Sequence, residues 1–277
     1  MNNYIFFYNT RFFTCVSPIG KETPQLVQHE IDFEDFEKLE LSGFELSLLL
    51  HHPHIVHTCA IYEDIIREKI IIIQAYLPGI TLENYIIYNK NRIDKKWIIS
   101  VLSQIADALA YLHSNGLVFN DLKTTNIIYN PQLHHITLID TTTISDEKQK
   151  ERAWTTIFAA PEMIDVLSKH LPKTSAVDMW SLGAILYELL KGYDTWPVKT
   201  AYDAYHVSNK QKNVLSSFDP TGHPPMLVDI LYNLLDYNPR TRLKATPLLR
   251  LLKQRRISSS NHSQTHITPH KTIRHSI

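Results

Sequence analysis

Short apolar runs separated by turn residues dominate the first quarter of the chain. Runs of this length, bounded by residues such as Pro18, Gly20 and Pro24, predict β-strands. Phe33–Leu50 differs, because its apolar residues recur at helical spacing and its acidic start suits the positive end of a helix dipole. We therefore expect a small unit with one helix and five antiparallel strands, at 3–9, 12–17, 24–31, 55–62 and 70–76.

The pattern becomes helical after Pro78-Gly79, which we interpret as a connection. Trp97–Ser114 carries one apolar stripe, and Gly116 supplies a residue suited to cap its end. From Ala176 onward, further helical segments are joined by loops that contain Pro and Gly. The sequence thus predicts an α+β fold in which the larger second part is mainly helical. The stripe consists of Ile98, Val101, Leu102, Ile105, Leu109 and Leu112.

Composition narrows the class of protein without identifying it. The 277 residues are 44% apolar, and 28 basic residues balance 28 acidic ones. This balance gives no reason to expect nucleic acid or a membrane as partner. Two cysteines without metal-like spacing, and no apolar run near ~18 residues, lead us to expect an intracellular, cytoplasmic protein. Residues 254–277 are rich in Ser, His and basic side chains, and we expect a disordered tail there.

The segment Leu117–Asn130 carries the residues with the clearest chemistry. It places Asp121, Lys123 and Asn126 on a short loop between the apolar helix and a strand, and Asp140 ends the next apolar run. An acid that accepts a proton, a nearby cation, and an amide with a second carboxylate for magnesium are what phosphoryl transfer requires. Each residue alone would more often be a solvated turn or a helix cap.

Further motifs follow in a fixed order, and together they resemble the eukaryotic-type protein kinase family. The chain contains Ala160-Pro161-Glu162, then Asp178-Met-Trp-Ser-Leu-Gly183, then Leu235-Asp-Tyr-Asn-Pro-Arg-Thr-Arg-Leu243. The resemblance implies a two-lobed kinase domain over residues 1–253. Its small lobe would span 1–76, its hinge 75–79 and its large lobe 80–253.

The resemblance implies a role for each residue of the loop. Asp121 would accept the proton of a substrate hydroxyl, and Lys123 would stabilise charge on the transferred phosphoryl group. Asn126 and Asp140 would hold Mg²⁺, or Mn²⁺, at the phosphates of ATP. A lysine two residues after the acid, with Thr155 placed to bond both, resembles the serine/threonine branch of the family. This resemblance implies a protein substrate.

Other residues would be structural or would contact the nucleotide. We expect Asp178 to anchor the catalytic loop and Glu162 to form a buried, bidentate ion pair with Arg242. Gln74 falls at the position that guards the back of the adenine pocket. The backbone that would meet the adenine edge belongs to Ala75, Tyr76 and Leu77.

Several departures from the family pattern concern residues that would bind the nucleotide. The glycine-rich loop between the first strands is absent, since no glycine precedes Gly20. His29 aligns with the family's third-strand lysine, and Lys21 is a possible substitute, as in the with-no-lysine kinases. Glu45 is the best candidate for the helix glutamate, and Glu40 is the other.

Two departures lie beside the catalytic residues. Phe119-Asn120 replaces His-Arg before Asp121, so no cation receives an activation-loop phosphate. Thr141-Thr142 replaces the usual Phe-Gly after Asp140, and we expect residues 141–153 to be a mobile polar segment.

The sequence leaves two functions open. The first is a divergent serine/threonine protein kinase that uses ATP and Mg²⁺. The second is a pseudokinase that serves as a binding or scaffold module for a partner protein, with little or no catalysis. A small-molecule kinase fits less well, because that class lacks the motifs at Glu162, Asp178 and Arg242.

Overall fold

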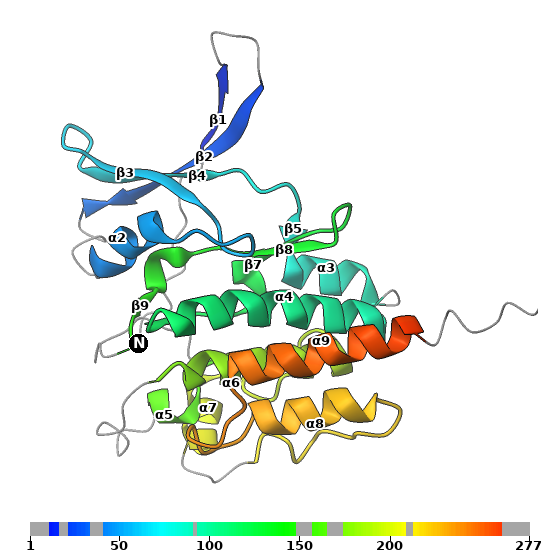
Figure 1. The fold of residues 1–277 in the computed structure, drawn as a ribbon. Helices are drawn as coiled ribbons and strands as arrows, with labels where there is room; N and C mark the ends of the chain where they lie inside the picture. Colours follow the sequence, from blue (N-terminus) through cyan, green and yellow to red (C-terminus); the bar gives the residue numbers. More distant parts are fainter. Residues whose placement is uncertain are drawn as a thin grey trace, which may run out of the picture.

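The computed structural model describes residues 11–16, 22–33, 41–90, 93–147, 157–164, 174–208 and 213–261. A small twisted sheet and the helix α2 (Leu41–Leu49) lie above a larger body built mainly of helices (Figure 1). This is the α+β, two-lobed architecture that the sequence predicts.

The sheet of the small lobe is antiparallel, and its order is β1-β2-β4-β3. The expected strand at 3–9 lies outside the described residues, so four of the five expected strands are described here. The four are β1 (Arg11–Val16), β2 (Glu22–Asp32), β3 (Thr58–Asp64) and β4 (Lys69–Ala75).

The strand expected to begin at residue 55 instead begins at Thr58. Ile55 forms a parallel bridge with Leu138 of the large lobe, and the amide of Val56 donates to the Leu138 carbonyl at 2.9 Å. Ile55 and Val56 are buried. Their apolar character therefore reflects a junction between the lobes and not a place in the sheet.

The two faces of this sheet differ in chemistry, because successive side chains of a strand point to opposite sides. The His29 face carries Ile31, Ile70 and Ile72, which form a small buried cluster. By register it also carries His29, opposite Ile72, and Gln74, opposite Val27. The Glu30 face carries Gln28 and Glu30, and charged residues surround them.

Helix α2 (Leu41–Leu49) is shorter in the described residues than the expected 33–50, since 34–40 fall outside them. Its backbone lies against the 3-10 turn η3 (Thr141–Thr143) of the large lobe. A Cβ atom at Gly43 would be 2.1 Å from the carbonyl oxygen of Thr142, which is far inside contact distance. A glycine is thus required for this close approach.

The helices of the large lobe pack around α6 (Ala176–Lys191), whose residues from Val177 to Leu189 are all buried. A helix that is buried on every side forms the core of its domain. The expected stripe on α4 (Lys95–Ser114) is also buried, so that prediction is confirmed. The other helices are α3 (Leu82–Tyr88), α5 (Pro161–Ile164), α7 (Ala201–Ser208), α8 (Pro225–Leu234) and α9 (Ala245–Asn261).

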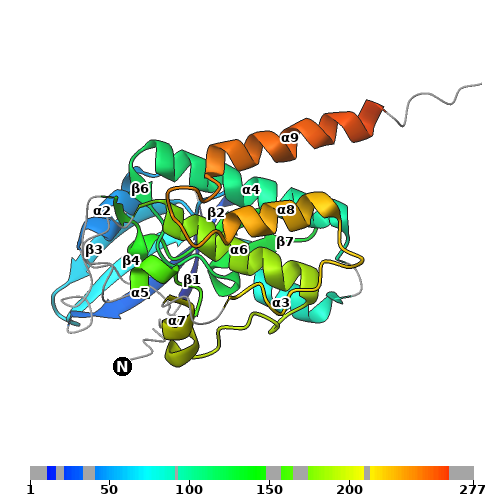
Figure 2. The same cartoon turned by 90° about the horizontal axis from the view of Figure 1, so that it is seen from below.

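Helix α9 packs along α4, as seen from below (Figure 2). It continues to Asn261, so residues 254–261 are helical where the sequence suggested disorder. Leu248 and Leu252 are fully buried, and a helix anchored in this way propagates readily into a polar sequence. No helix in the described part of the chain is long and apolar enough to cross a lipid bilayer.

Short strands position the loop of interest. β5 (Ile80–Thr81), β7 (Ile127–Asn130) and β8 (His135–Leu138) form one sheet in the order β5-β7-β8. β6 (Leu117–Val118) pairs with β9 (Ser145–Asp146).

Candidate active site

The loop after β6 is held by a buried carboxylate of α6. Asp178 is fully buried and accepts hydrogen bonds from the backbone amides of Phe119 and Asn120, each at 2.9 Å. His113, in the last turn of α4, also contacts it, with Nε2 2.8 Å from Asp178 Oδ2. Three elements therefore converge on one side chain, which fixes where the loop begins.

Asp121, Lys123 and Asn126 come together on this loop. Lys123 Nζ lies 2.7 Å from Asp121 Oδ2, and Asn126 Nδ2 donates to the same oxygen at 3.0 Å. Asn126 Nδ2 also donates to the Asp121 backbone carbonyl at 2.9 Å. Asp121 is buried except for 8% of its surface, so its carboxylate is held in one orientation.

Asp140 lies beside this group. The amide of Ile139 donates to the Asn126 carbonyl at 2.9 Å, which ties the two segments together. Asp140 has a left-handed backbone (φ 61°), and Thr142 Oγ1 donates to its Oδ1 at 2.6 Å. Burial raises the pKa of the Asp140 carboxyl, while the Thr142 hydrogen bond opposes that rise.

The donors present fit a magnesium ion that is shared with a nucleotide. No cluster of three or more His, Cys, Asp or Glu side chains in the described residues could hold a metal without other ligands. Mg²⁺, however, is commonly bound by one or two carboxylates together with substrate phosphates and water. Because the Asn126 nitrogen is turned toward Asp121, its amide oxygen is presented on the other side.

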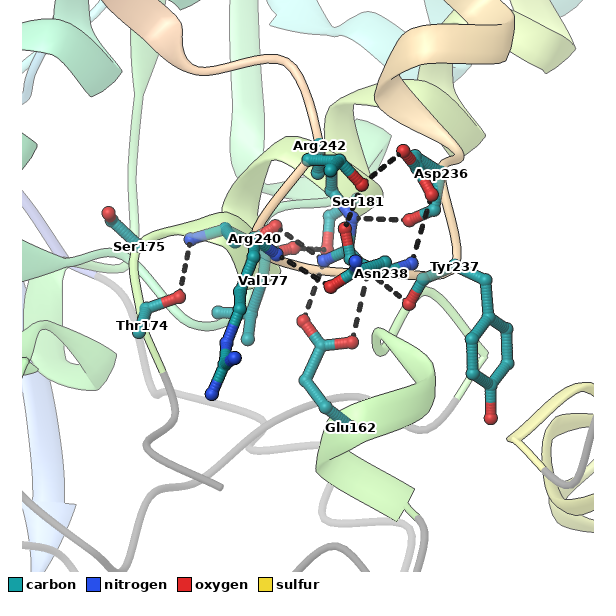
Figure 3. A network of polar contacts seen from close by, with 12 residues as sticks. Glu162, Thr174, Ser175, Val177, Ser181, Asp236, Tyr237, Asn238, Arg240 and Arg242 are labelled. Carbon is teal, nitrogen blue, oxygen red and sulfur yellow. Dashed lines mark hydrogen bonds and ion pairs between the residues drawn. The ribbon is translucent and has the colours of Figure 1, made fainter.

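Glu162 and Arg242 form the expected ion pair (Figure 3). The geometry is bidentate, at 2.6 Å and 3.0 Å, and the Arg242 side chain is fully buried. Arg242 also donates to the carbonyls of Ala176 and Asp236, and its guanidinium lies over the Trp180 ring at 5.2 Å. These contacts fasten α5 to α6 and to the loop after α8.

The residues expected at the nucleotide lie on the two inner strands of the small sheet, β2 and β4, and directly after the end of β4. Gln74 is buried, and its Nε2 donates to Thr58 Oγ1 at 3.1 Å. Ala75 ends β4, with its amide bonded to the His57 carbonyl, and Tyr76 and Leu77 follow it. His29 is half-buried on the same face as Gln74, and burial lowers the pKa of its imidazole. An imidazole thus occupies the position aligned with the family's lysine.

Some expected residues lie outside the described part of the chain. These are Lys21, Glu40 and Thr155. Glu45 belongs to α2, but its side chain falls outside the described residues as well.

The segment after Asp140 differs from the expectation of a mobile stretch. Residues 141–147 form the η3 turn and strand β9, and Thr141, Ile144 and Ser145 are buried. From the sequence alone, Asn120 and Thr142 count only as losses from the family pattern. Asn120 donates to the distant Thr143 carbonyl, which the sequence does not reveal, and Thr142 donates to the nearby Asp140 carboxylate. The remainder of the expected mobile segment, 148–153, lies outside the described residues.

The chain is similar in sequence to known proteins. The family model described as "Protein kinase domain" matches residues 28–251. The chain is 28% identical over 185 residues to the serine/threonine-protein kinase PAK mbt of Drosophila melanogaster, a match that covers 64% of this chain and 28% of that protein. It is 28% identical over 199 residues to the serine/threonine-protein kinase Nek8 of Danio rerio, covering 70% of this chain and 27% of Nek8.

A third relative is matched over most of its length. Aurora kinase C of Mus musculus is 25% identical over 227 residues, which covers 81% of this chain and 78% of that kinase. The chain thus spans about a quarter of the length of PAK mbt and Nek8 and most of Aurora kinase C. Since the family model covers most of the chain, from within β2 to within α9, this protein belongs to the protein kinase family.

Proposed function

We propose that the protein is a serine/threonine protein kinase that transfers the γ-phosphoryl group of ATP to a protein hydroxyl. The observation that carries this proposal is the joint placement of Asp121, Lys123 and Asn126, with Asp140 beside them. Membership of the family supports protein phosphorylation in general. We take the kinase domain to cover residues 1–253 and to act in the cytoplasm.

Each side chain has a task in the proposed reaction. Asp121 takes the proton as the serine or threonine oxygen forms its bond to the γ-phosphorus and the bond from that phosphorus to the ADP oxygen breaks. Lys123 places positive charge where the transferred group becomes more negative. Asn126 and Asp140 offer the oxygens for Mg²⁺, which when bound neutralises phosphate charge.

A second function rests on a specific observation. His29 stands where a fixed cation is expected, and burial lowers the pKa of its imidazole. This favours a pseudokinase, which would bind a partner protein and would handle ATP weakly or not at all. The two proposals differ in whether the protein transfers a phosphoryl group.

The deciding experiment compares purified wild-type protein with Asp121→Asn, using ATP with Mg²⁺ or Mn²⁺ and a panel of serine- and threonine-containing proteins. A kinase gives transfer that falls by about 10²–10⁴-fold in the variant, as expected for loss of a general base. Equal, background transfer by both proteins contradicts the kinase proposal. A thermal-shift titration with ATP·Mg then shows whether the protein binds nucleotide, because a bound ligand raises stability by mass action.

A further inference from the structure

Asn120 lies between the two halves of the candidate active site. It follows the loop's anchor at Phe119 and precedes Asp121, and only 6% of its surface is exposed. Its backbone is left-handed, with φ 70°, which asparagine tolerates better than most residues. The left-handed backbone therefore orients the Asn120 side chain differently from a side chain on helical or extended backbone. The backbone amide of Asn120 is itself held by the Asp178 carboxylate.

The side-chain amide of Asn120 reaches across to the segment that follows Asp140. Nδ2 donates to the Thr143 carbonyl at 2.6 Å and lies 3.0 Å from Ser145 Oγ. It also lies 3.2 Å from the Val118 carbonyl. Two of these partners are carbonyl oxygens, which only accept hydrogen bonds, so the nitrogen and not the oxygen of the amide must face them.

Neighbouring hydrogen bonds join the same two segments. Thr143 Oγ1 donates back to the Phe119 carbonyl at 2.9 Å, and the amide of Glu147 donates to the Gly116 carbonyl at 2.9 Å. The Glu147 carboxylate in turn accepts from the amide of Ser175, just before α6, at 2.8 Å. The Asn120 amide thus ends a set of contacts, which includes the β6–β9 pairing, that joins residues 116–120 to 143–147.

We propose that Asn120 is a positioning residue that sets the register between the loop carrying Asp121 and the turn carrying Asp140. This inference rests on the proposed function, because it assigns a residue that serves the same site. The connection uses a neutral amide and backbone groups, so it requires no phosphate on the protein. The proton acceptor, Asp121, directly follows Asn120 in the sequence. The candidate metal ligand, Asp140, lies three residues before Thr143, whose carbonyl accepts the Asn120 hydrogen bond.

The test uses phosphatase-treated protein and three variants. Asn120→Asp keeps the shape of the side chain but replaces the donor with an acceptor that faces two carbonyls. Asn120→Gly removes the amide and tolerates the positive φ, so it guards against failure of the first variant to fold. Asn130→Asp is the matched control, because Asn130 is also buried but uses its Oδ1 as acceptor for the amides of Gln132 and Leu133.

The first measurement is amide hydrogen exchange of residues 141–147. Because a buried group that loses its hydrogen bond is strongly destabilising, we expect exchange there to be about tenfold faster or more in both Asn120 variants. Exchange in α4 and α6 should stay unchanged, as should exchange at 141–147 in Asn130→Asp. Equal exchange in all four proteins overturns the proposal, whatever the activity.

The second measurement is steady-state kinetics. Loss of register predicts that kcat falls about tenfold or more in both Asn120 variants, with KM for ATP changed much less. Faster exchange with an unchanged kcat overturns the positioning role. If the wild-type protein transfers no phosphoryl group, the proposed function fails, and the exchange comparison alone decides whether the amide holds the two segments together.

Discussion

The large-lobe loop and the small-lobe sheet use charge in different ways. In the loop, the Asp121 carboxylate meets a cation and an amide at 2.7 Å and 3.0 Å. In the sheet, the cations are on the Glu30 face, where Arg67 and Lys69 lie 3.3 Å and 3.4 Å from the Glu30 carboxylate. The His29 face, which also carries Gln74, presents an imidazole at the position aligned with the lysine.

The behaviour of these titratable groups sharpens the contrast. Burial by itself would raise the pKa of Glu30, but the hydrogen bond from Lys69 and the charge of Arg67 outweigh it and lower that pKa. For His29, burial lowers the pKa, because it disfavours the charged form of the imidazole. The sheet thus stabilises charge on the side away from Gln74. The candidate catalytic loop and the small-lobe sheet therefore differ in where each stabilises charge.

The largest effect is expected where a charge pair is fully buried. Arg242→Ala leaves the Glu162 carboxylate without its partner, so we expect a loss of about 3–5 kcal/mol in the free energy of unfolding. Arg67→Ala is the matched small-lobe variant, because its side chain is 44% exposed and Lys69 still contacts Glu30. It should cost about 0–1 kcal/mol. Urea denaturation measures the free energy of unfolding of both variants. Similar losses would contradict the expected difference between the buried and the exposed ion pair.

Glu188 is the exception among the buried charges of the large lobe. Its Oε2 is buried with no hydrogen-bond partner among the described residues, and burial raises the pKa of the carboxyl from 4.5 to about 7. Ionising it in the folded protein therefore costs about 3 kcal/mol above pH 7.

The consequence for stability has a definite sign. The folded state holds the Glu188 proton more tightly, so this group's contribution is full below pH 4.5 and is lost as the pH rises through about 7. Glu188→Gln should consequently stabilise the protein by up to about 3 kcal/mol at pH 8 and by little at pH 5. Urea denaturation at the two pH values measures the difference. A pH-independent effect would rule out this account.

Gly43→Ala tests the contact between the two regions. Alanine in a helix is normally more stable than glycine by about 0.5–1 kcal/mol. Here its Cβ would be 2.1 Å from the Thr142 carbonyl oxygen, so α2 must move away from the η3 turn. We expect a loss of about 1–3 kcal/mol in thermal or urea unfolding. An increase in the stability of Gly43→Ala would show that α2 does not pack closely against the η3 turn.

The smallest effect is expected for His29→Lys, which tests nucleotide binding by the small lobe directly. A cation on the Gln74 face should tighten ATP·Mg binding about tenfold, the scale of one charged hydrogen bond. The control is Gln28→Lys, which adds the same charge at the adjacent position of β2 on the opposite face. Isothermal titration calorimetry compares the two. Equal affinities would mean that the face of the sheet does not decide nucleotide binding.

Local patterns predicted much of this fold. The apolar stripe of α4 is buried as expected, because helical periodicity is a property of the segment itself. The ordered motifs identified Asp121, Asp178, Glu162 and Arg242 and predicted the bidentate pair. Backbone contacts between distant segments could not be anticipated in the same way. The bridge from Ile55 to Leu138 joins positions far apart in sequence, and a short apolar run looks the same in a sheet or at a junction.

The sequence by itself determined the family, the order of the helices and strands, and the residues with chemical capacity at Asp121 and Asp140. Each of these depends on residue type and spacing, which the chain carries along its length. The tertiary structure decided the hydrogen-bond partners of Asn120, the ordering of residues 141–147 and the face on which the small lobe places its cations. These depend on which backbone carbonyls and side chains meet across the fold, and that follows from packing.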